Sequence, residues 1–375
     1  MRLHQQRVAV LAVVLGCVSL VIASIWTVLP GPLASRSVPR DGQVVLTHSH
    51  VPPTDSALLH RYEERLTQVK NVKTKAGSPL YEGRSVGGLR YLAWHSTTEY
   101  CRVTTSWIMV YLHGAGEIGT DIREVYSSLG GRGTIPNLII DRRRDDDGGG
   151  RSGNVHDADC ADRHTHPLLN GSLGDVLVLA PQSSEGWTSS DAELTLVHAL
   201  IQDHLTAPHR SGCPRAPVDG GGAKAHVVVT GVSQGGYAVL RMIELYGRSI
   251  VAAVALCGFS FSLPVLLGAV GNCDTTAVML AHGSNDIVVP ARESRRIFQE
   301  LSATNCRKYV ARYSKATSHV GIPTDGALLR SRFALVEYDQ AADPLDGNEA
   351  AAGHAVWRDL YAASSPLWPW LSSRQ

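Results

Sequence analysis

One serine of this chain lies in a setting that suits nucleophilic catalysis. Residues 231–235 read Gly-Val-Ser-Gln-Gly, with an apolar, β-branched run before them and a helix-like segment after them. A sharp turn from strand to helix exposes a serine hydroxyl, and only small residues let the backbone pass on either side of it. The amides at the start of the helix also face the negative charge that develops during acyl transfer. We therefore predict that Ser233 is a nucleophile; the alternative is a glycine turn without chemistry.

A second glycine-rich segment could stabilise that charge. Residues 113–116 read His-Gly-Ala-Gly and follow the apolar run 107–112, which is typical of a buried strand. Such a loop can supply a backbone N–H to the oxyanion of a tetrahedral intermediate, and one such donor lowers the barrier by about 3–4 kcal/mol. The sequence predicts the two donors to be the amides of Ala115 and of Gln234, the residue after Ser233. A glycine turn without a ligand is the alternative here.

The other members of a Ser-His-Asp triad should follow at later strand ends, in that chain order of Ser, Asp and His. Asp286 lies in a small-residue loop after the apolar run 277–281, where a carboxylate can fix the tautomer of a histidine. A solvated loop aspartate or a helix cap is the competing interpretation. Two histidines could be the base: His354, in a Gly-His turn just before Trp357, and His319, which follows a strand-like run. The sequence favours His354 and leaves His319 open.

Short apolar runs alternate with helix-like segments along most of the chain. The runs are rich in valine and bounded by Gly or Pro, which is typical of strands buried on both faces. The alternation predicts an α/β fold with a mostly parallel central sheet and helices on both faces. A further helix is expected over 56–72 from its periodic leucines. Strands are expected at 89–94, 107–112, 175–180, 226–230, 251–257, 277–281, 309–313 and 333–338, and the main helices at 191–204, 236–246 and 291–301.

One catalytic domain, 54–375, is predicted to carry three surface insertions. The segments 141–166 and 207–225 are rich in Gly with charged residues or Pro, and they cannot bury enough apolar area to offset their chain entropy. A third insertion is expected at 314–352, with a strand of its own. Metal-ligand types gather at 156–166, but a flexible loop lacks the surrounding hydrogen bonds that fix a coordination geometry. We predict no metal and no cofactor.

The N-terminal segment is predicted to enter or cross a membrane. Residues 8–29, from Val8 to Leu29, form an uncharged, apolar run that follows Arg2 and Arg7. A helix of that length reaches about 33 Å, close to the roughly 30 Å hydrocarbon core. A signal anchor at 1–29 is favoured over a cleaved signal peptide, and 30–53 is expected to be a stalk. The catalytic domain is then lumenal or extracellular, and secreted if the segment is cleaved.

Composition is compatible with a globular enzyme of the secretory pathway. Six of the seven cysteines lie outside the apolar run, and in an oxidising compartment they could form up to three disulfides. The tripeptide 170–172, Asn-Gly-Ser, is a possible glycosylation acceptor. Lys+Arg 35 against Asp+Glu 34 leaves a net charge of +1, so no global field draws the protein to nucleic acid. A content of 44% hydrophobic residues excludes a wholly disordered chain.

Several motifs in chain order carry a more specific likeness. They are His113–Glu117, Pro181 with Gln182, Gly186 with Trp187, Gly231–Gly236, His282 with Gly283 and Asp286, and Gly353 with His354, Trp357 and Tyr361. The sequence resembles the α/β-hydrolase serine esterases over about residues 87–375. It is most similar to the predicted-peptidase and feruloyl-esterase-like group, related to the phospholipase/carboxylesterase and acyl-protein thioesterase families.

The resemblance implies an α/β-hydrolase fold with Ser233, Asp286 and His354 as the triad. It also implies that Trp187 lies near the acyl pocket and Glu117 near the oxyanion loop. The expected activity is hydrolysis of a small-molecule or acyl carboxylic ester through an acyl-enzyme intermediate. An acyl-thioesterase or a serine peptidase would use the same triad. A membrane-tethered binding protein that has the fold without activity is the alternative of another class.

Overall fold

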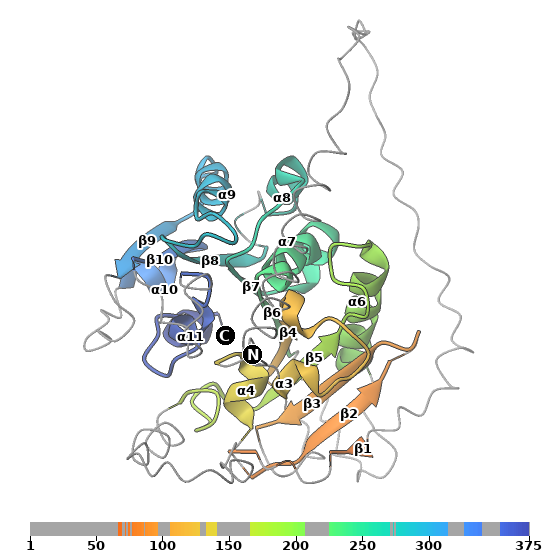
Figure 1. Cartoon of the computed structure of the whole chain (residues 1–375). Coiled ribbons are helices and arrows are strands. Elements are labelled where there is room, and N and C mark those ends of the chain that lie inside the picture. The colour runs from red at the N-terminus through yellow and green to blue at the C-terminus, as the bar shows by residue number, and fades with distance from the viewer. Residues whose placement is uncertain are drawn as a thin grey trace, which may run out of the picture. The chain divides into compact units, whose positions relative to one another are not determined.

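The computed structural model describes residues 67–374, with gaps at 70–71, 73, 76, 86, 97–105, 128–132, 141–165, 207–224, 271–272, 274, 314–325 and 340–352 (Figure 1). The predicted signal anchor and stalk lie outside the described residues, as do the first two predicted insertions apart from residues 166 and 225. These assignments stay predictions. Within the residues that the structure describes, no helix is both long enough and apolar enough to cross a membrane.

The described part of the chain forms a sheet of ten strands in the order β1-β2-β3-β5-β4-β6-β7-β8-β10-β9. The pairs from β1 to β5 on one side are antiparallel, and all the others are parallel. A mostly parallel sheet is therefore confirmed. The strands are β1 Thr67–Gln68, β2 Leu80–Arg84, β3 Arg90–His95, β4 Trp107–Leu112, β5 Val176–Gln182, β6 His226–Val232, β7 Ala252–Leu256, β8 Ala277–Gly283, β9 Lys308–Tyr313 and β10 Phe333–Tyr338.

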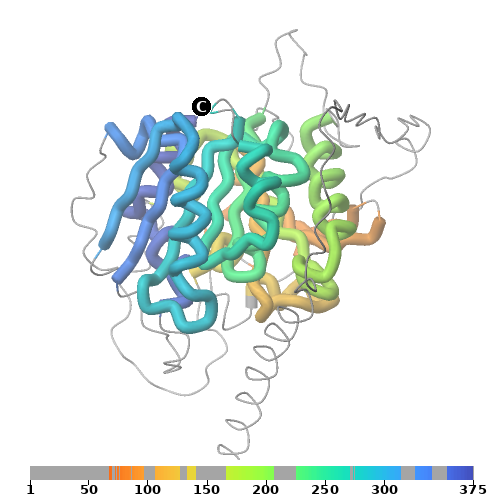
Figure 2. Tube along the Cα trace, turned by 90° about the horizontal axis from the view of Figure 1, so that it is seen from above, coloured from red at the N-terminus to blue at the C-terminus, as the bar shows by residue number. Residues whose placement is uncertain are grey.

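Helices bury both faces of the sheet, as the continuous apolar strands predicted. In β4, Met109 and its alternate neighbours pack in one hydrophobic core, and Val110 and its alternate neighbours pack in a second core on the opposite face. The second core is covered by α6, α7, α8 and α9, which lie along that face (Figure 2). The helices are α3 Glu124–Ser127, α4 Ile135–Ile139, α6 Asp191–Thr206, α7 Gln234–Tyr246, α8 Leu263–Val270, α9 Arg292–Ser302, α10 Gly326–Arg330, α11 Trp357–Leu360 and α12 Leu367–Ser372, with short 3₁₀ turns η1 Ala115–Glu117 and η2 Gly247–Ser249.

Two predictions about these elements are wrong. The helix expected over 56–72 does not include Thr67–Gln68, which form β1 and pair with β2; residues 56–66 lie outside the described residues. The strand expected inside a surface insertion, β10, lies between β8 and β9 in the sheet, and all its residues are buried. Pairing with β2 overrides the local helical pattern at Thr67–Gln68, because the partner strand supplies the backbone hydrogen bonds.

The described cysteines form one disulfide, between Cys273 and Cys306. Cys257 is free and buried. The six cysteines outside the apolar run therefore do not all pair within the chain, and three intrachain disulfides are excluded. Cys101, Cys160 and Cys213 lie outside the described residues.

Parallel pairing brings the predicted site residues to one edge of the sheet. Ala115 follows β4, Ser233 follows β6 and Asp286 follows β8, and the strands β4, β6, β7 and β8 are consecutive neighbours in the sheet. In open α/β sheets this carboxyl edge is where ligands bind. The same edge is therefore where a site assembled from distant motifs can form.

Candidate active site

Ser233 lies at a tight turn between β6 and α7. Its φ of 56° and ψ of −117° place a non-glycine residue in the left-handed half of backbone space. Such a conformation is strained and persists only where the surrounding structure imposes it. The amide of Ser233 donates to the carbonyl of Leu256 at the end of β7, 2.9 Å away, which ties the turn to the neighbouring strand. The side chain is partly exposed, as a nucleophile requires.

The glycines around Ser233 allow two backbones to approach closely. A Cβ on Gly235 would lie 2.6 Å from the carbonyl oxygen of His113 at the end of β4. A Cβ on Gly231, at the end of β6, would lie 2.6 Å from the carbonyl oxygen of Gly235 in α7. The first turn of α7 therefore packs directly on the segment that begins the predicted oxyanion loop. The structure brings the two glycine-rich motifs together.

The predicted oxyanion loop is held by side chains from the end of β5 and the loop after it. Ala115 begins η1 and is exposed, and Gln234 is the first residue of α7. The side-chain amide of Gln182 donates to the carbonyl of Glu117, 3.1 Å away, and to that of Asp121, 2.8 Å away. The role of Gln182 was not predicted, although it lies in one of the motifs that carried the resemblance.

His113 is a neutral, structural histidine within this loop. Its Nε2 accepts a hydrogen bond from the amide of Ser183 over 2.9 Å, so Nδ1 carries the ring proton and donates to the carbonyl of Gly114 over 2.7 Å. Burial lowers the pKa of His113 to about 4, because the charged imidazolium loses its hydration. The ring therefore fixes the loop and does not exchange protons near neutral pH.

Two residues predicted to bind substrate are both buried: Trp187, which the resemblance placed near the acyl pocket, and Glu117, which it placed near the oxyanion loop. Trp187 is 1% exposed, and its indole N–H donates to the carbonyl of His113 over 3.0 Å. Glu117 is 3% exposed and is the last residue of η1. In this conformation Trp187 supports the predicted oxyanion loop from the protein interior, and its ring does not face solvent.

Asp286 and His354 are in direct contact. His354 Nδ1 lies 2.7 Å from Asp286 Oδ2, and the amides of Val288 and Val289 donate to Oδ1 over 2.8 and 3.0 Å. Burial raises the pKa of Asp286, but the hydrogen bonds from His282 and His354 outweigh it and leave the pKa well below its usual range. Asp286 is therefore an ionised acceptor held on both oxygens, and the alternative of a solvated loop aspartate is ruled out by its 6% exposure.

A glycine turn determines where His354 lies. Gly353 has a φ of +82°, and a Cβ there would lie 2.7 Å from the amide nitrogen of Asp286. The turn therefore packs on the loop after β8 and places His354 against Asp286. Burial lowers the pKa of His354, but Cys257 and Asp286 raise it by more, so it lies above its ordinary value of 6.5. His319 lies outside the described residues.

His282 is a second histidine on the same carboxylate and was not predicted as a site residue. Its Nε2 lies 3.2 Å from Asp286 Oδ2 and 2.7 Å from the carbonyl of Val289, so Nε2 carries a proton. Its Nδ1 lies 2.7 Å from the hydroxyl of Ser294 on α9. The side chains of His282 and Asp286 are both fully buried. The sequence showed His282 only as part of a motif. The signal that could have identified it is a histidine directly after the apolar run 277–281, four residues before Asp286.

Cys257 completes the surroundings of His354. It follows β7, has a φ of +41° and is buried, and its thiol lies 3.5 Å from the carbonyl oxygen of His354. Its preceding residue, Leu256, accepts the hydrogen bond from Ser233. Cys257 thus lies between the turn that carries Ser233 and the Asp286–His354 pair.

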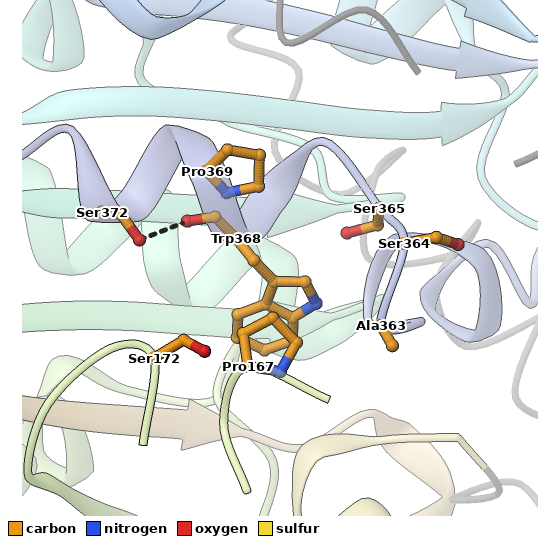
Figure 3. A pocket seen from close by; sticks show the side chains of 8 residues that line it. All are labelled: Pro167, Ser172, Ala363, Ser364, Ser365, Trp368, Pro369 and Ser372. Atoms are coloured by element: carbon orange, nitrogen blue, oxygen red, sulfur yellow. Dashed lines mark hydrogen bonds between the residues drawn. The ribbon is translucent and has the colours of Figure 1, made fainter. Parts of the chain in front are cut away.

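A separate hollow of about 300 Å³ lies beside α12 (Figure 3). Its lining contains no ionisable side chain, so it offers no general acid or base. None of Ser233, Asp286 and His354 borders it. The lining residues are Pro167, Ser172, Ala363, Ser364, Ser365, Trp368, Pro369 and Ser372.

Comparison with known proteins agrees with this arrangement. The model of the phospholipase/carboxylesterase family matches residues 168–323, a segment that contains Ser233 and Asp286 and ends before His354. The chain has the α/β-hydrolase fold. The resemblance drawn from the motifs is thereby confirmed, and the family supports an ester hydrolase. No curated protein matches this chain significantly.

Solved structures similar to this chain include three hydrolases. A thermostable esterase is 17% identical, with a TM-score of 0.45, and the match covers 80% of this chain and 60% of that one. A mutant of the feruloyl esterase module from Clostridium thermocellum, complexed with sinapinate, is 12% identical, with a TM-score of 0.46 and coverages of 82% and 88%. A putative dienelactone hydrolase from Klebsiella pneumoniae is 14% identical, with a TM-score of 0.38 and coverages of 74% and 92%.

Proposed function

We propose that this chain hydrolyses carboxylic esters by a serine acyl-transfer mechanism. The observation that carries the proposal is the contact between Asp286 and His354 at the sheet edge where Ser233 occupies a strained strand-to-helix turn. Each of the three groups then has the surroundings that its step requires: a partly exposed hydroxyl, a histidine with a fixed tautomer and an ionised, buried carboxylate.

The roles follow from the hydrogen bonds. Nδ1–H of His354 donates to Asp286, so the other ring nitrogen, Nε2, is assigned to accept the proton of Ser233 while the serine oxygen attacks the ester carbonyl. The amides of Ala115 and Gln234 are assigned to the oxyanion. His354 then gives its proton to the leaving alcohol, and water repeats the two steps to release the acid. The raised pKa of His354 favours the imidazolium that forms at each attack.

The test is turnover of a short-chain nitrophenyl ester by Ser233→Ala. Loss of a triad nucleophile lowers kcat by about 10⁴ to 10⁶, while the thermal unfolding of the variant should match that of the parent. Ser249→Ala is the matched control, because Ser249 lies at the other end of α7, where its hydroxyl donates to the carbonyl of Tyr246. Unchanged turnover in Ser233→Ala contradicts the proposal.

The parent protein and Ser233→Ala also distinguish the alternative functions. A fluorophosphonate probe should label the parent and not Ser233→Ala, and absence of labelling favours a binding protein without activity. Relative kcat/KM for ester, thioester and peptide substrates distinguishes an esterase from a thioesterase and from a peptidase. We expect the ester to be cleaved faster than the peptide, because an alcohol departs more readily than an amine, and the ratio of ester to thioester turnover separates the other two functions.

A further inference from the structure

Cys257 has no role in the proposed mechanism, yet it lies in the centre of the site. It is a free cysteine with 0% exposure, and its amide donates to the carbonyl of Ala281 in β8, which fixes the start of its loop. The left-handed φ of +41° sets it in a tight turn directly after β7, as Ser233 is set after β6. Its thiol contacts the carbonyl oxygen of His354 at 3.5 Å.

Three different ligand types converge at this point. The sulfur of Cys257, a carboxylate oxygen of Asp286 and a ring nitrogen of His354 all lie within 4.8 Å of one another. All three residues are more than nine-tenths buried. Thiolate, carboxylate and imidazole are the ligands that proteins use for Zn²⁺, and two ligand atoms on one tetrahedral Zn²⁺ are roughly 3.3–3.8 Å apart. Shifts on the order of 1 Å would bring the three atoms to those separations.

We propose that Cys257, Asp286 and His354 form an inhibitory site for a thiophilic divalent cation, Zn²⁺ or Cd²⁺, with water as the fourth ligand. The two charges of the cation are balanced by one thiolate and one carboxylate, so the loaded site is neutral. That balance suits a buried position, where an uncompensated charge is costly. Binding needs no oxidant or reductant. The cluster is separate from the cysteine and histidines at 156–165, which lie outside the described residues.

Inhibition follows from the proton balance and rests on the proposed function. The cation replaces the proton between Nδ1 of His354 and Asp286, and that proton moves to Nε2. The thiol proton of Cys257 goes to solvent as the sulfur binds the metal. Nε2 then carries a hydrogen and cannot accept the proton of Ser233. The cation therefore stops turnover without touching Ser233.

Metal binding is tested without reference to activity. Cd²⁺ is titrated into the full chain, with the disulfide intact, while the ultraviolet charge-transfer absorption of a Cd²⁺–thiolate bond is followed. The difference between the parent and Cys257→Ala isolates this sulfur from the other cysteines. We expect the band to be weaker in Cys257→Ala and in Cys257→Ser by one equivalent of Cd²⁺. Equal bands in the parent and both folded variants overturn the proposal.

Inhibition is tested by titrating Zn²⁺ during turnover of a nitrophenyl ester at the pH plateau. We expect reversible inhibition that EDTA removes, and a concentration for half-inhibition at least about tenfold higher in Cys257→Ala and Cys257→Ser. On that plateau His354 is deprotonated in the parent and in both variants, so the shift of the acid limb that Cys257 causes does not enter the comparison. Metal-free kcat of each variant is measured there as its own reference, and inhibition is expressed relative to it. Inhibition of the variants at the parent's Zn²⁺ concentration contradicts the site. A Cd²⁺–Cys257 band without any ester turnover contradicts the proposed function and supports the metal site.

Discussion

His282 should determine how well Asp286 holds His354. The side chain of His282 is fully buried, and its Nε2–H is shared between Asp286 Oδ2, 3.2 Å away, and the carbonyl of Val289, 2.7 Å away. His282→Leu removes this donor. His282→Gln keeps an amide N–H near the position of Nε2. The carboxylate in His282→Leu keeps the two amide donors on Oδ1 but loses one of its two donors on Oδ2, so the oxygen that faces His354 is less well fixed.

The size of the effect follows from the geometry. A hydrogen bond to a charged group contributes about 1.5–3 kcal/mol, and this one is long and shared, which places it near the lower limit. Since about 1.4 kcal/mol corresponds to a factor of ten, kcat in His282→Leu should fall about tenfold, with KM little changed. Loss of the donor also raises the pKa of Asp286 and strengthens its attraction for the proton of His354. The acid limb of kcat/KM should therefore move to higher pH.

The assay is nitrophenyl ester turnover across pH, beside thermal unfolding of each variant. Ser294→Ala is the matched control, because it removes only the hydroxyl on the other ring nitrogen of His282. We expect His282→Gln to recover most of kcat and to restore the pH limb. A purely structural role would lower the unfolding temperature and leave the pH limb in place. An unchanged kcat and pH limb in a folded His282→Leu protein would refute the reasoning.

Three further outcomes follow from the site. Gly235→Ala should lower the free energy of unfolding by about 1–3 kcal/mol and reduce turnover, because its Cβ would lie 2.6 Å from a backbone oxygen; urea unfolding measures this, and parental stability contradicts it. Burial holds the pKa of His113 near 4 in the folded protein, so between pH 6.5 and 4 the unfolded chain binds a proton at His113 that the folded protein does not. As the pH is lowered through that range, the free energy of unfolding should therefore fall by up to about 3 kcal/mol. His113→Gln should show a shallower fall in urea titrations at several pH values, and equal slopes would show that another group is responsible. The acid limb of kcat/KM should lie above pH 6.5, because the pKa of His354 is raised, and Cys257→Ala should move it down; a limb below 6.5 is the contrary result.

Much of the sheet could be predicted, because a buried strand is recognisable from its own continuous run of apolar residues. The continuous apolar runs gave β4, β6, β7 and β8 to within two residues at each end, and these are the strands that carry the site. Which strands pair depends on residues far apart in the chain, and the predicted positions of strands in the sheet were less accurate. Phe333–Tyr338 was expected to be a strand, but its place between β8 and β9 was not evident from its own residues. Thr67–Gln68 joined β2 because pairing supplied hydrogen bonds that a helical pattern does not reveal.

The sequence by itself determined the turn at Ser233, because a strand, two flanking glycines and a helix are neighbours in the chain. It also identified Asp286 as a carboxylate at a strand end. The contact between Asp286 and His354, 68 residues apart, was decided by the tertiary structure. It depends on the left-handed turn at Gly353 packing on the loop after β8. The tertiary structure also decided the roles of His282 and Cys257. Each is buried and contacts the Asp286–His354 pair only because separate strands end at the same edge of the sheet.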